Sequence, residues 1–208
     1  MSDEKKSIEK HFLQSAKLLN SIATDKYVSI IYSMGQLIAN SIEDGGKLML
    51  CGNGGSAADA QHLAAELLVR LRPKVNRQGI PAIALAMDSS TMTACGNDFG
   101  FEMLYERMVD TLGQKNDVLL VITTSGRSSN VIGALKKAQS KGILTLGFLG
   151  AGGGPAMAFC DFSFVAPSDD TALVQESHIA AGHALMITVE DLLLAKDIIK
   201  EGSLSGEH

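Results

Sequence analysis

Short apolar runs alternate with longer helical patterns along the chain. Five of the runs read as strands: Lys47–Cys51, Pro81–Ala86, Asp117–Thr123, Ile143–Leu149 and Asp161–Val165. Each run is nearly continuous in hydrophobicity, and helix-compatible segments separate most of them, which is typical of a parallel sheet buried on both faces. We therefore expect an α/β fold: a five-stranded parallel doubly wound sheet in the flavodoxin-like strand order 2-1-3-4-5.

Helical patterns flank this predicted sheet on both sides in the sequence. Two amphipathic stretches, roughly Glu4–Ala23 and Lys26–Ile42, precede the first strand, and a long stretch at about Ala172–Ile199 follows the last one. The middle of the long stretch, Ser177–Val189, contains no Asp, Glu, Lys or Arg, which is too apolar for a helix with one face in water. We expect this C-terminal helix to be buried, partly by other subunits.

Length and composition fit one domain. The 208 residues are 46% hydrophobic and 20% charged, which is enough to bury a sizeable core without disulfides or metals. We expect a single domain over residues 1–208, with N-terminal helices at 1–45, an α/β core at 46–170 and the C-terminal helix at 171–200.

Charge and cysteine content exclude several classes of protein. The net charge of −5 and the absence of a Lys/Arg-rich run argue against a nucleic-acid partner. The first residues are charged where a secretory signal is apolar, and no apolar run reaches the roughly 18 residues of a membrane span. We expect a cytoplasmic protein with no membrane partner. Cys51, Cys95 and Cys160 lie far apart and read as small buried residues rather than as a disulfide or thiolate-zinc framework.

A glycine-rich turn, Gly52–Ser56, follows the first predicted strand and opens a predicted helix at Ala57–Leu71. Such a turn lets backbone N–H groups approach an anion at a helix N-terminus. It matches only the loose G-x-G-x-x-A form of the dinucleotide fingerprint, and no Walker lysine follows. The alternative is a tight turn in which Ser56 caps the helix.

Five hydroxyl side chains surround Gly126 in the loop that follows the third predicted strand, between Thr123 and Ser129. They precede a predicted helix, Asn130–Lys141, and provide a dense set of donors for a phosphate dianion. An ordinary capped turn needs only one or two hydroxyls. In the predicted strand order both loops lie at the topological switch point, so we expect them to face one crevice.

Polar side chains recur at helical spacing after the first loop. Asp59, His62, Glu66 and Arg70 are separated by three, four and four residues and fall on one stripe of a helix. Apolar positions such as Leu68 point in another direction. A solvated helix face would explain the stripe, but a His and a Glu one turn apart also suit metal binding or acid/base work.

The C-terminal helix also carries polar residues in an apolar segment. Gln175 and His183 are eight residues apart and can face one side, whereas His178 points away from His183. Glu176 completes the set. Histidine on an apolar helix is often a hydrogen-bonded core residue, so spacing alone leaves the structural and functional interpretations open.

Taken together, several motifs resemble bacterial phosphoheptose isomerases, a family built on the sugar-isomerase (SIS) domain. The resemblance covers about residues 10 to 197. It rests on GNGGSAADAQH (Gly52–His62), Glu66, GNDFGFE (Gly96–Glu102), TTSGRS (Thr123–Ser128) and VQESHIAAGH (Val174–His183).

The resemblance implies a homotetramer with active sites at subunit interfaces. It also implies conversion of sedoheptulose 7-phosphate to D-glycero-D-manno-heptose 7-phosphate, a step toward the heptose of the lipopolysaccharide core. The implied zinc ligands, with one zinc per subunit, are His62, Glu66, Gln175 and His183. The implied substrate-binding residues are Asn53, Gly54, Gly55, Ser56, His62, Glu66, Asn97, Asp98, Thr123, Thr124, Ser125, Ser128 and Gln175.

The residue types agree with this chemistry. Moving a carbonyl between C1 and C2 through an enediol needs one positioned base and one acid. The resemblance implies that Glu66 and His183 form this catalytic pair. Our hypothesis is that Glu66 removes the proton from carbon and that His183 handles protons on oxygen, although the division of roles remains open. Arg127 stands where many relatives have Asn or Lys. Its side chain either contacts the phosphate or points to solvent.

Two other functions remain open beside the enzyme. A non-catalytic SIS-domain relative binds the bacterial replication initiator, and it lacks the full acid/base and metal set that this sequence contains. A sugar-phosphate-sensing module would need the phosphate loop but no base, and its usual DNA-binding domain is absent from this sequence.

Overall fold

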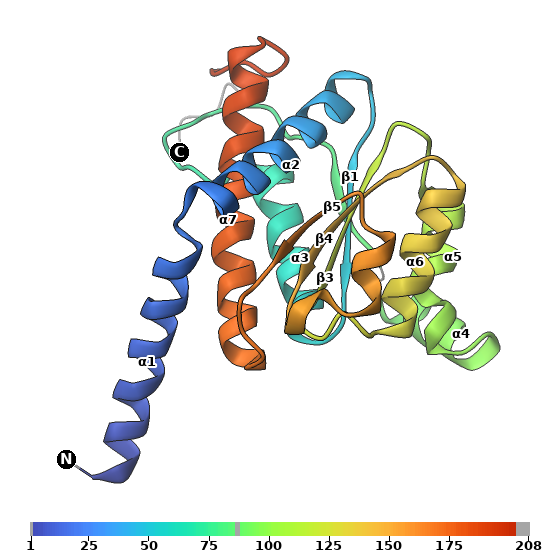
Figure 1. Cartoon of the computed structure of the whole chain (residues 1–208). Coiled ribbons are helices and arrows are strands. Elements are labelled where there is room, and N and C mark those ends of the chain that lie inside the picture. Colours follow the sequence, from blue (N-terminus) through green and yellow to red (C-terminus); the bar gives the residue numbers. More distant parts are fainter. Residues whose placement is uncertain (1, 86–87, 203–208) are drawn as a thin grey trace.

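Five parallel strands form one sheet with the order β2-β1-β3-β4-β5, as predicted (Figure 1). This computed structural model describes residues 2–85 and 88–202. The strands are β1 (Leu48–Gly52), β2 (Ala82–Ala84), β3 (Val118–Thr123), β4 (Leu144–Leu149) and β5 (Phe162–Val165). All residues of the central strands β1 and β3 are buried, which accounts for their continuous hydrophobicity. The second strand is shorter than predicted, and Ala86 lies outside the described residues.

Helices surround the sheet. The α-helices are α1 (Asp3–Ile22), α2 (Asp25–Glu43), α3 (Gly55–Ala65), α4 (Ser89–Asp98), α5 (Leu104–Leu112), α6 (Ser129–Ser140) and α7 (Thr171–Ala195). Short helical segments are η1 (Glu66–Arg70), η2 (Phe101–Met103), η3 (Ala151–Gly153) and η4 (Pro155–Phe159). Helices α2, α3 and α7 cover one face of the sheet, and α5 and α6 cover the other (Figure 1).

The predicted helix at Ala57–Leu71 differs from the structure at both ends. Helix α3 begins at Gly55, so Gly54 rather than Ser56 occupies the N-cap position, and Ser56 is buried in the first turn. After Ala65 the helix continues as one π turn, η1. The wider turn shifts the following residues around the axis, and Leu68 is exposed instead of lying with the apolar positions.

Helix α7 is a core helix of this chain. Its buried residues include His178, Leu185 and Val189, so the prediction of a buried helix is confirmed within one chain, and its contact with other subunits stays a prediction. By length and composition alone, α7 is a helix that could cross a membrane, although the sequence analysis predicted no apolar run of that length. Its packing against α1, α2 and α3 explains the apolar composition without a membrane.

Helix α1 projects away from the sheet at the N-terminal end (Figure 1). Only Leu18 of this helix is buried, while Phe12 and Leu13 are 67% and 65% exposed. The carboxylate of Glu176 on α7 accepts hydrogen bonds from Ser15 and, at 2.7 Å, from His11. These bonds fix the angle of α1 but leave much of its apolar surface uncovered.

The three cysteines are free thiols. Cys51 and Cys95 are buried and Cys160 is half-buried, in agreement with the expected packing role. Burial raises the pKa of the Cys160 thiol to about 12, and the nearby carboxylate of Asp161 adds to the shift. Burial also raises the pKa of the Cys51 thiol, so Cys51 and Cys160 stay protonated at neutral pH.

Candidate active site

The β1 loop and the β3 loop lie side by side at the carboxyl edge of the sheet. Asn53 of the first loop and Asn130 of helix α6 exchange two amide hydrogen bonds of 2.8 and 2.9 Å. The side-chain amide oxygen of Asn130 also accepts the backbone N–H of Val131. The expectation that both loops lie together at the switch point is thereby confirmed, the shared crevice stays a prediction, and Asn130, which the sequence analysis missed, is the residue that joins the loops.

The hydroxyl loop keeps its side chains available for a ligand. The Thr123 hydroxyl accepts the backbone N–H of Gly126 at 3.2 Å, and the Ser125 hydroxyl accepts that of Arg127. Ser128 occupies the N-cap position of α6, yet its side chain does not cap the helix. Thr124 and Ser125 are partly exposed, whereas Arg127 is exposed. Because the Ser128 side chain does not cap α6, the loop is not an ordinary capped turn, and an anion can approach the N-terminus of this helix.

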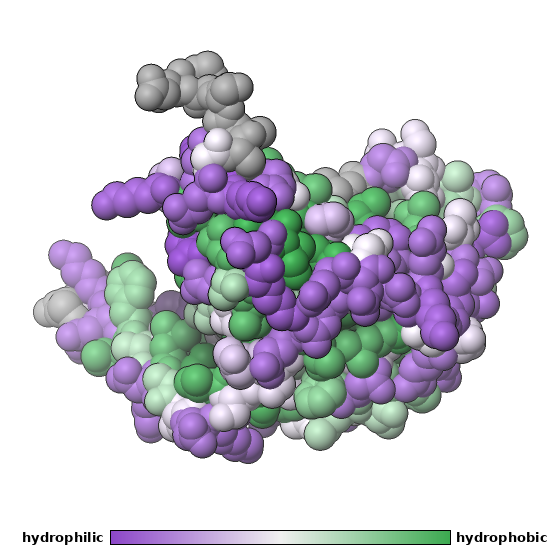
Figure 2. Space-filling model, turned by 90° about the horizontal axis from the view of Figure 1, so that it is seen from above, coloured by the Kyte–Doolittle hydropathy of each residue, from purple (hydrophilic) through white to green (hydrophobic). Residues whose placement is uncertain are grey.

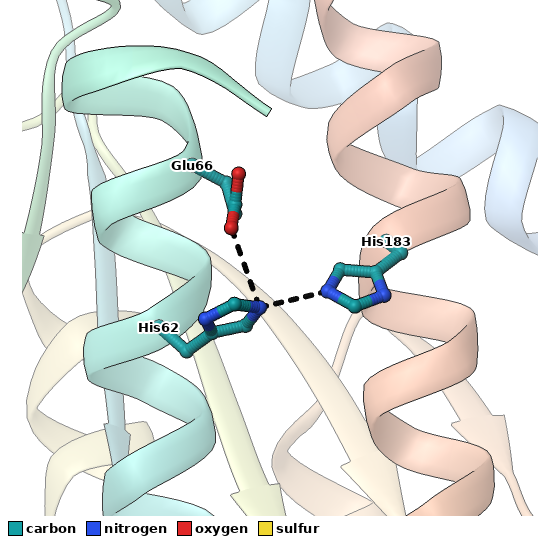
Figure 3. Close-up of side chains that lie close together, drawn as sticks. All are labelled: His62, Glu66 and His183. Atoms are coloured by element: carbon teal, nitrogen blue, oxygen red, sulfur yellow. Dashed lines mark hydrogen bonds and ion pairs between the residues drawn. The ribbon is translucent and has the colours of Figure 1, made fainter. Parts of the chain in front are cut away.

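Three side chains, one each from α3, η1 and α7, meet in one cluster (Figure 3). The Nε2 atoms of His62 on α3 and His183 on α7 are 2.8 Å apart, and Glu66 Oε1 lies 3.4 Å from His62 Nε2. The His62 side chain is 46% exposed and the Glu66 side chain 15%. The cluster is thus open to a ligand on the histidine side and backed by protein on the carboxylate side.

A glycine allows α7 to approach α3 at this cluster. A Cβ atom added at Gly182 would lie 2.6 Å from a methyl group of Leu63, so any larger residue would require the Leu63 side chain or one of the two helices to shift. Leu63 follows His62 and Gly182 precedes His183. The close helix contact therefore sets the separation of the two imidazoles.

Gln175 lies toward the start of α3. Its amide nitrogen donates to Asp59, and its amide oxygen accepts a 3.4 Å hydrogen bond from Ser56. A Cβ atom added at Gly55 would lie 3.0 Å from the same amide oxygen. Two of the glycine-loop residues predicted to bind substrate thus contact Gln175, and the role of Gln175 as a metal ligand stays a prediction.

Asp59 is a part of the site that the sequence analysis placed only on the polar stripe of the helix. Partial burial raises the pKa of its carboxyl group to about 6, and the positive charge of a protonated His62 partly opposes this shift. The signal in the sequence was its position three residues before His62. A carboxyl group whose pKa lies near neutrality is a feature of functional sites.

Other predicted residues lie apart from this cluster. Asn97 and Asp98 end helix α4, are exposed, and contact each other through a 2.7 Å hydrogen bond. No hydrogen bond between described residues joins them to the histidine cluster. His178 points away from His183 as predicted: it is fully buried and its Nε2 lies 3.0 Å from the Leu149 carbonyl oxygen.

The donor set fits a zinc ion. One ligand atom from each of His62, Glu66 and His183 lies within 4.8 Å of the others. Tetrahedral zinc with bonds of about 2.0–2.1 Å needs neighbouring donors roughly 3.3 Å apart. Small side-chain rotations bring the observed 2.8 and 3.4 Å separations to that value. Two imidazoles and one carboxylate are also a common protein ligand set for a catalytic zinc with an open position.

Comparison with known proteins gives consistent matches along the chain. Residues 11–150 match the family described as the SIS domain. The phosphoheptose isomerase of Maridesulfovibrio salexigens is 45% identical over 183 residues, 88% of each chain. That of Clostridium acetobutylicum is 42% identical and covers 93% of this chain and 98% of its own length. The solved phosphoheptose isomerase structure from Francisella tularensis superposes with a TM-score of 0.85 at 33% identity, covering 92% of this chain and 100% of that one.

Proposed function

We propose, from the premise that the chain belongs to the phosphoheptose isomerase family of SIS-domain proteins, that it converts sedoheptulose 7-phosphate to D-glycero-D-manno-heptose 7-phosphate. The observation that carries the proposal is the cluster of His62, Glu66 and His183 in a chain whose β3 loop is rich in hydroxyl groups. The loop can hold a phosphate, and the cluster can move protons. An aldose-ketose isomerase needs both parts within one crevice.

The phosphate end of the substrate would bind the β3 loop. Thr123, Thr124, Ser125 and Ser128 offer hydroxyl groups, and the N-terminus of α6 adds backbone N–H groups and a favourable dipole. Asn53, Gly54, Gly55 and Ser56 would contact the sugar hydroxyls, since the β1 loop lies between this phosphate site and Gln175. The substrate would then extend from the β3 loop toward α7.

Glu66 and His183 would carry out the proton transfer. In our hypothesis the Glu66 carboxylate removes a proton from C1 and returns it to C2, so that the substrate passes through a planar enediol. His183 would exchange the proton between the oxygens of C1 and C2. The low exposure of the Glu66 side chain favours this role, because protein rather than water surrounds much of the carboxylate that would face the substrate.

We further propose that His62, Glu66, Gln175 and His183 hold one zinc ion per subunit. When bound, the ion would supply Lewis-acid stabilisation of the developing negative oxygen. A ligand that is also the base must keep one carboxylate oxygen for the substrate, and Glu66 has two oxygens for these two tasks.

A homotetramer with sites at subunit interfaces is the assembly that we propose. The support is an apolar groove of about 370 Å³ between α1, α2 and α7, lined by side chains that include Leu19, Ile22 and Tyr32. Apolar side chains also lie exposed along the projecting arm at the left of Figure 2, where α1 lies. The exposed Asn97 and Asp98 would then reach the site of a neighbouring subunit. Light scattering that gives the mass of one chain would contradict this assembly.

The product would enter heptose synthesis for the lipopolysaccharide core in the cytoplasm, where phosphorylated sugars are made. The test is the incubation of purified protein with sedoheptulose 7-phosphate and detection of the aldose by NMR. No turnover with or without added zinc would reject the enzyme and favour the initiator-binding or sugar-phosphate-sensing functions.

A further inference from the structure

Arg77 is a buried cation outside the proposed ligand set. It lies in the segment between η1 and β2 and is 1% exposed. Arginine is almost never fully buried unless its charge is paired and its N–H groups are hydrogen-bonded. The groups that accept hydrogen bonds from Arg77 therefore indicate the role of this side chain.

The guanidinium group of Arg77 caps the π turn that begins with Glu66. Its Nη2 donates to the Glu66 carbonyl oxygen at 2.9 Å, and its Nη1 donates to the Leu67 carbonyl oxygen at 2.9 Å. The Leu67 oxygen also accepts the backbone N–H of Ile80. A buried side chain thus donates to two successive carbonyl groups of this turn. The backbone of Glu66 is therefore held directly by Arg77.

The same guanidinium group reaches the second helix of the site. Its Nε donates to the carboxylate of Glu190 on α7, and that carboxylate is 1% exposed. Glu190 follows His183 by seven residues, two helical turns along the same face. One planar side chain thus bonds both to the backbone of Glu66 and to the helix that carries His183.

We propose that Arg77 is a positioning residue for the isomerase reaction, fixing the π turn of Glu66 at a set distance from α7 and His183. The inference rests on the proposed function, in which these two residues act as a pair. Arginine suits the role because its planar fork bonds several acceptors in fixed directions, whereas lysine offers one flexible ammonium group.

Arg72 provides a matched control. It donates to the same Glu190 carboxylate and to Asp191, but it is partly exposed and contacts neither carbonyl oxygen of the π turn through any bond between described residues. The variant Arg72→Met removes an ion pair with Glu190 and leaves the bonds of Arg77 in place. A general effect of losing charge beside Glu190 would therefore appear in both variants.

The experiment compares kinetics and metal affinity in three variants. Arg77→Met would leave the buried Glu190 carboxylate with only the partly exposed Arg72 as its partner, so we choose the double variant Arg77→Met/Glu190→Met, which removes both buried charges together. Arg77→Lys keeps the charge if the double variant does not fold. The kcat and KM for sedoheptulose 7-phosphate and the dissociation constant for Zn²⁺ alone are measured, with the unfolding midpoint as the test of folding.

We expect folded Arg77 variants to lose about 10- to 100-fold in kcat and in Zn²⁺ affinity, as is typical when a residue that orients a ligand is removed. The KM should change little, because the phosphate loop lies on other elements, and Arg72→Met should match the wild type. A kcat and a Zn²⁺ affinity equal to those of Arg72→Met would overturn the inference.

An inactive wild-type protein would instead reject the proposed function. Crystal structures of the wild type and the double variant then decide the role of Arg77 independently of turnover. A displaced Glu66 carboxylate or His183 ring in the variant supports the positioning role, and unchanged positions of both overturn it.

Discussion

The Nε2 atoms of His62 and His183 face each other at 2.8 Å, although the two residues are 121 positions apart in the sequence. Two unprotonated ring nitrogens at this distance would repel each other through their lone pairs. Either one nitrogen carries a hydrogen that the other accepts, or a cation lies between them. The arrangement therefore indicates a site where a proton and a metal ion compete.

Removal of one imidazole should abolish metal binding. Mutation of a residue that only hydrogen-bonds to a metal ligand typically weakens metal binding by about 10- to 100-fold. We expect His183→Ala, which removes a ligand itself, to weaken the affinity for Zn²⁺ by more than about 100-fold. Calorimetric titration of the chelator-treated protein measures the affinity. His11→Ala, which removes a histidine bonded to Glu176 and outside the proposed zinc ligands, is the control and should bind zinc normally. Equal affinities in the two variants would exclude His183 as a ligand.

Loss of a hydroxyl group from the β3 loop should weaken substrate binding. A hydrogen bond to a charged group contributes about 1.5–3 kcal/mol, so Ser128→Ala should raise KM by roughly 10- to 100-fold with a smaller change in kcat. Steady-state kinetics measure both constants. Ser140→Ala serves as the control, because that hydroxyl donates to the Lys137 carbonyl oxygen at the far end of α6. An unchanged KM in Ser128→Ala would place the phosphate elsewhere.

Backbone packing should make Gly126 intolerant of a side chain. Gly126 and Gly152 both have a positive φ, at 63° and 71°, but an added Cβ meets the Gly153 carbonyl oxygen at 2.0 Å only in the first case. We expect Gly126→Ala to lose about 1–3 kcal/mol more than Gly152→Ala, the usual cost of overpacking. Denaturant unfolding of the two variants measures the difference. Equal losses would mean that the neighbouring loop moves aside without cost.

The pH dependence of stability should depend on His178. Burial between Phe148 and Phe164 lowers the pKa of this imidazole from 6.5 to about 4. A group whose pKa is lower when folded takes up its proton more readily when the chain is unfolded. The free energy of unfolding is therefore unaffected above pH 6.5 and falls as the pH decreases toward 4, by about 3 kcal/mol in total.

The variant His178→Gln tests this dependence. Unfolding by urea between pH 7 and pH 4.5 should show a steep loss of stability in the wild type and a shallower one in the variant, which has no imidazole at that position. His11→Ala should keep the steep loss. Parallel curves for the wild type and His178→Gln would show that other groups cause the acid sensitivity.

The sheet could be predicted from the sequence because its strands are buried on both faces. Continuous apolar runs such as Val118–Thr123 mark such strands, and the glycine and hydroxyl loops follow directly from their carboxyl ends. The His62 and Glu66 pairing was also visible, since both lie on one helix. These features depend on residues that are close in the sequence.

Contacts between distant elements could not be read from spacing. The π turn at Glu66 depends on Arg77 in a later segment, and the approach of His183 to His62 depends on Gly182 packing against Leu63. The Asn53 and Asn130 pair joins two loops in the same way. No local pattern encodes these contacts, because each arises from the packing of elements that only the folded chain brings together.

The central claim is that Glu66 moves a proton from C1 to C2 of the sugar phosphate. Conversion of sedoheptulose 7-phosphate in D₂O, followed by NMR of the product, tests it most directly, with Glu66→Gln as the matched variant. We predict that the wild type incorporates deuterium at C2 to the extent that the Glu66 carboxyl group exchanges its proton with D₂O before returning it, and that the folded variant forms product at least about 100-fold more slowly. Product formed by folded Glu66→Gln at the rate of the wild type would contradict the role of Glu66.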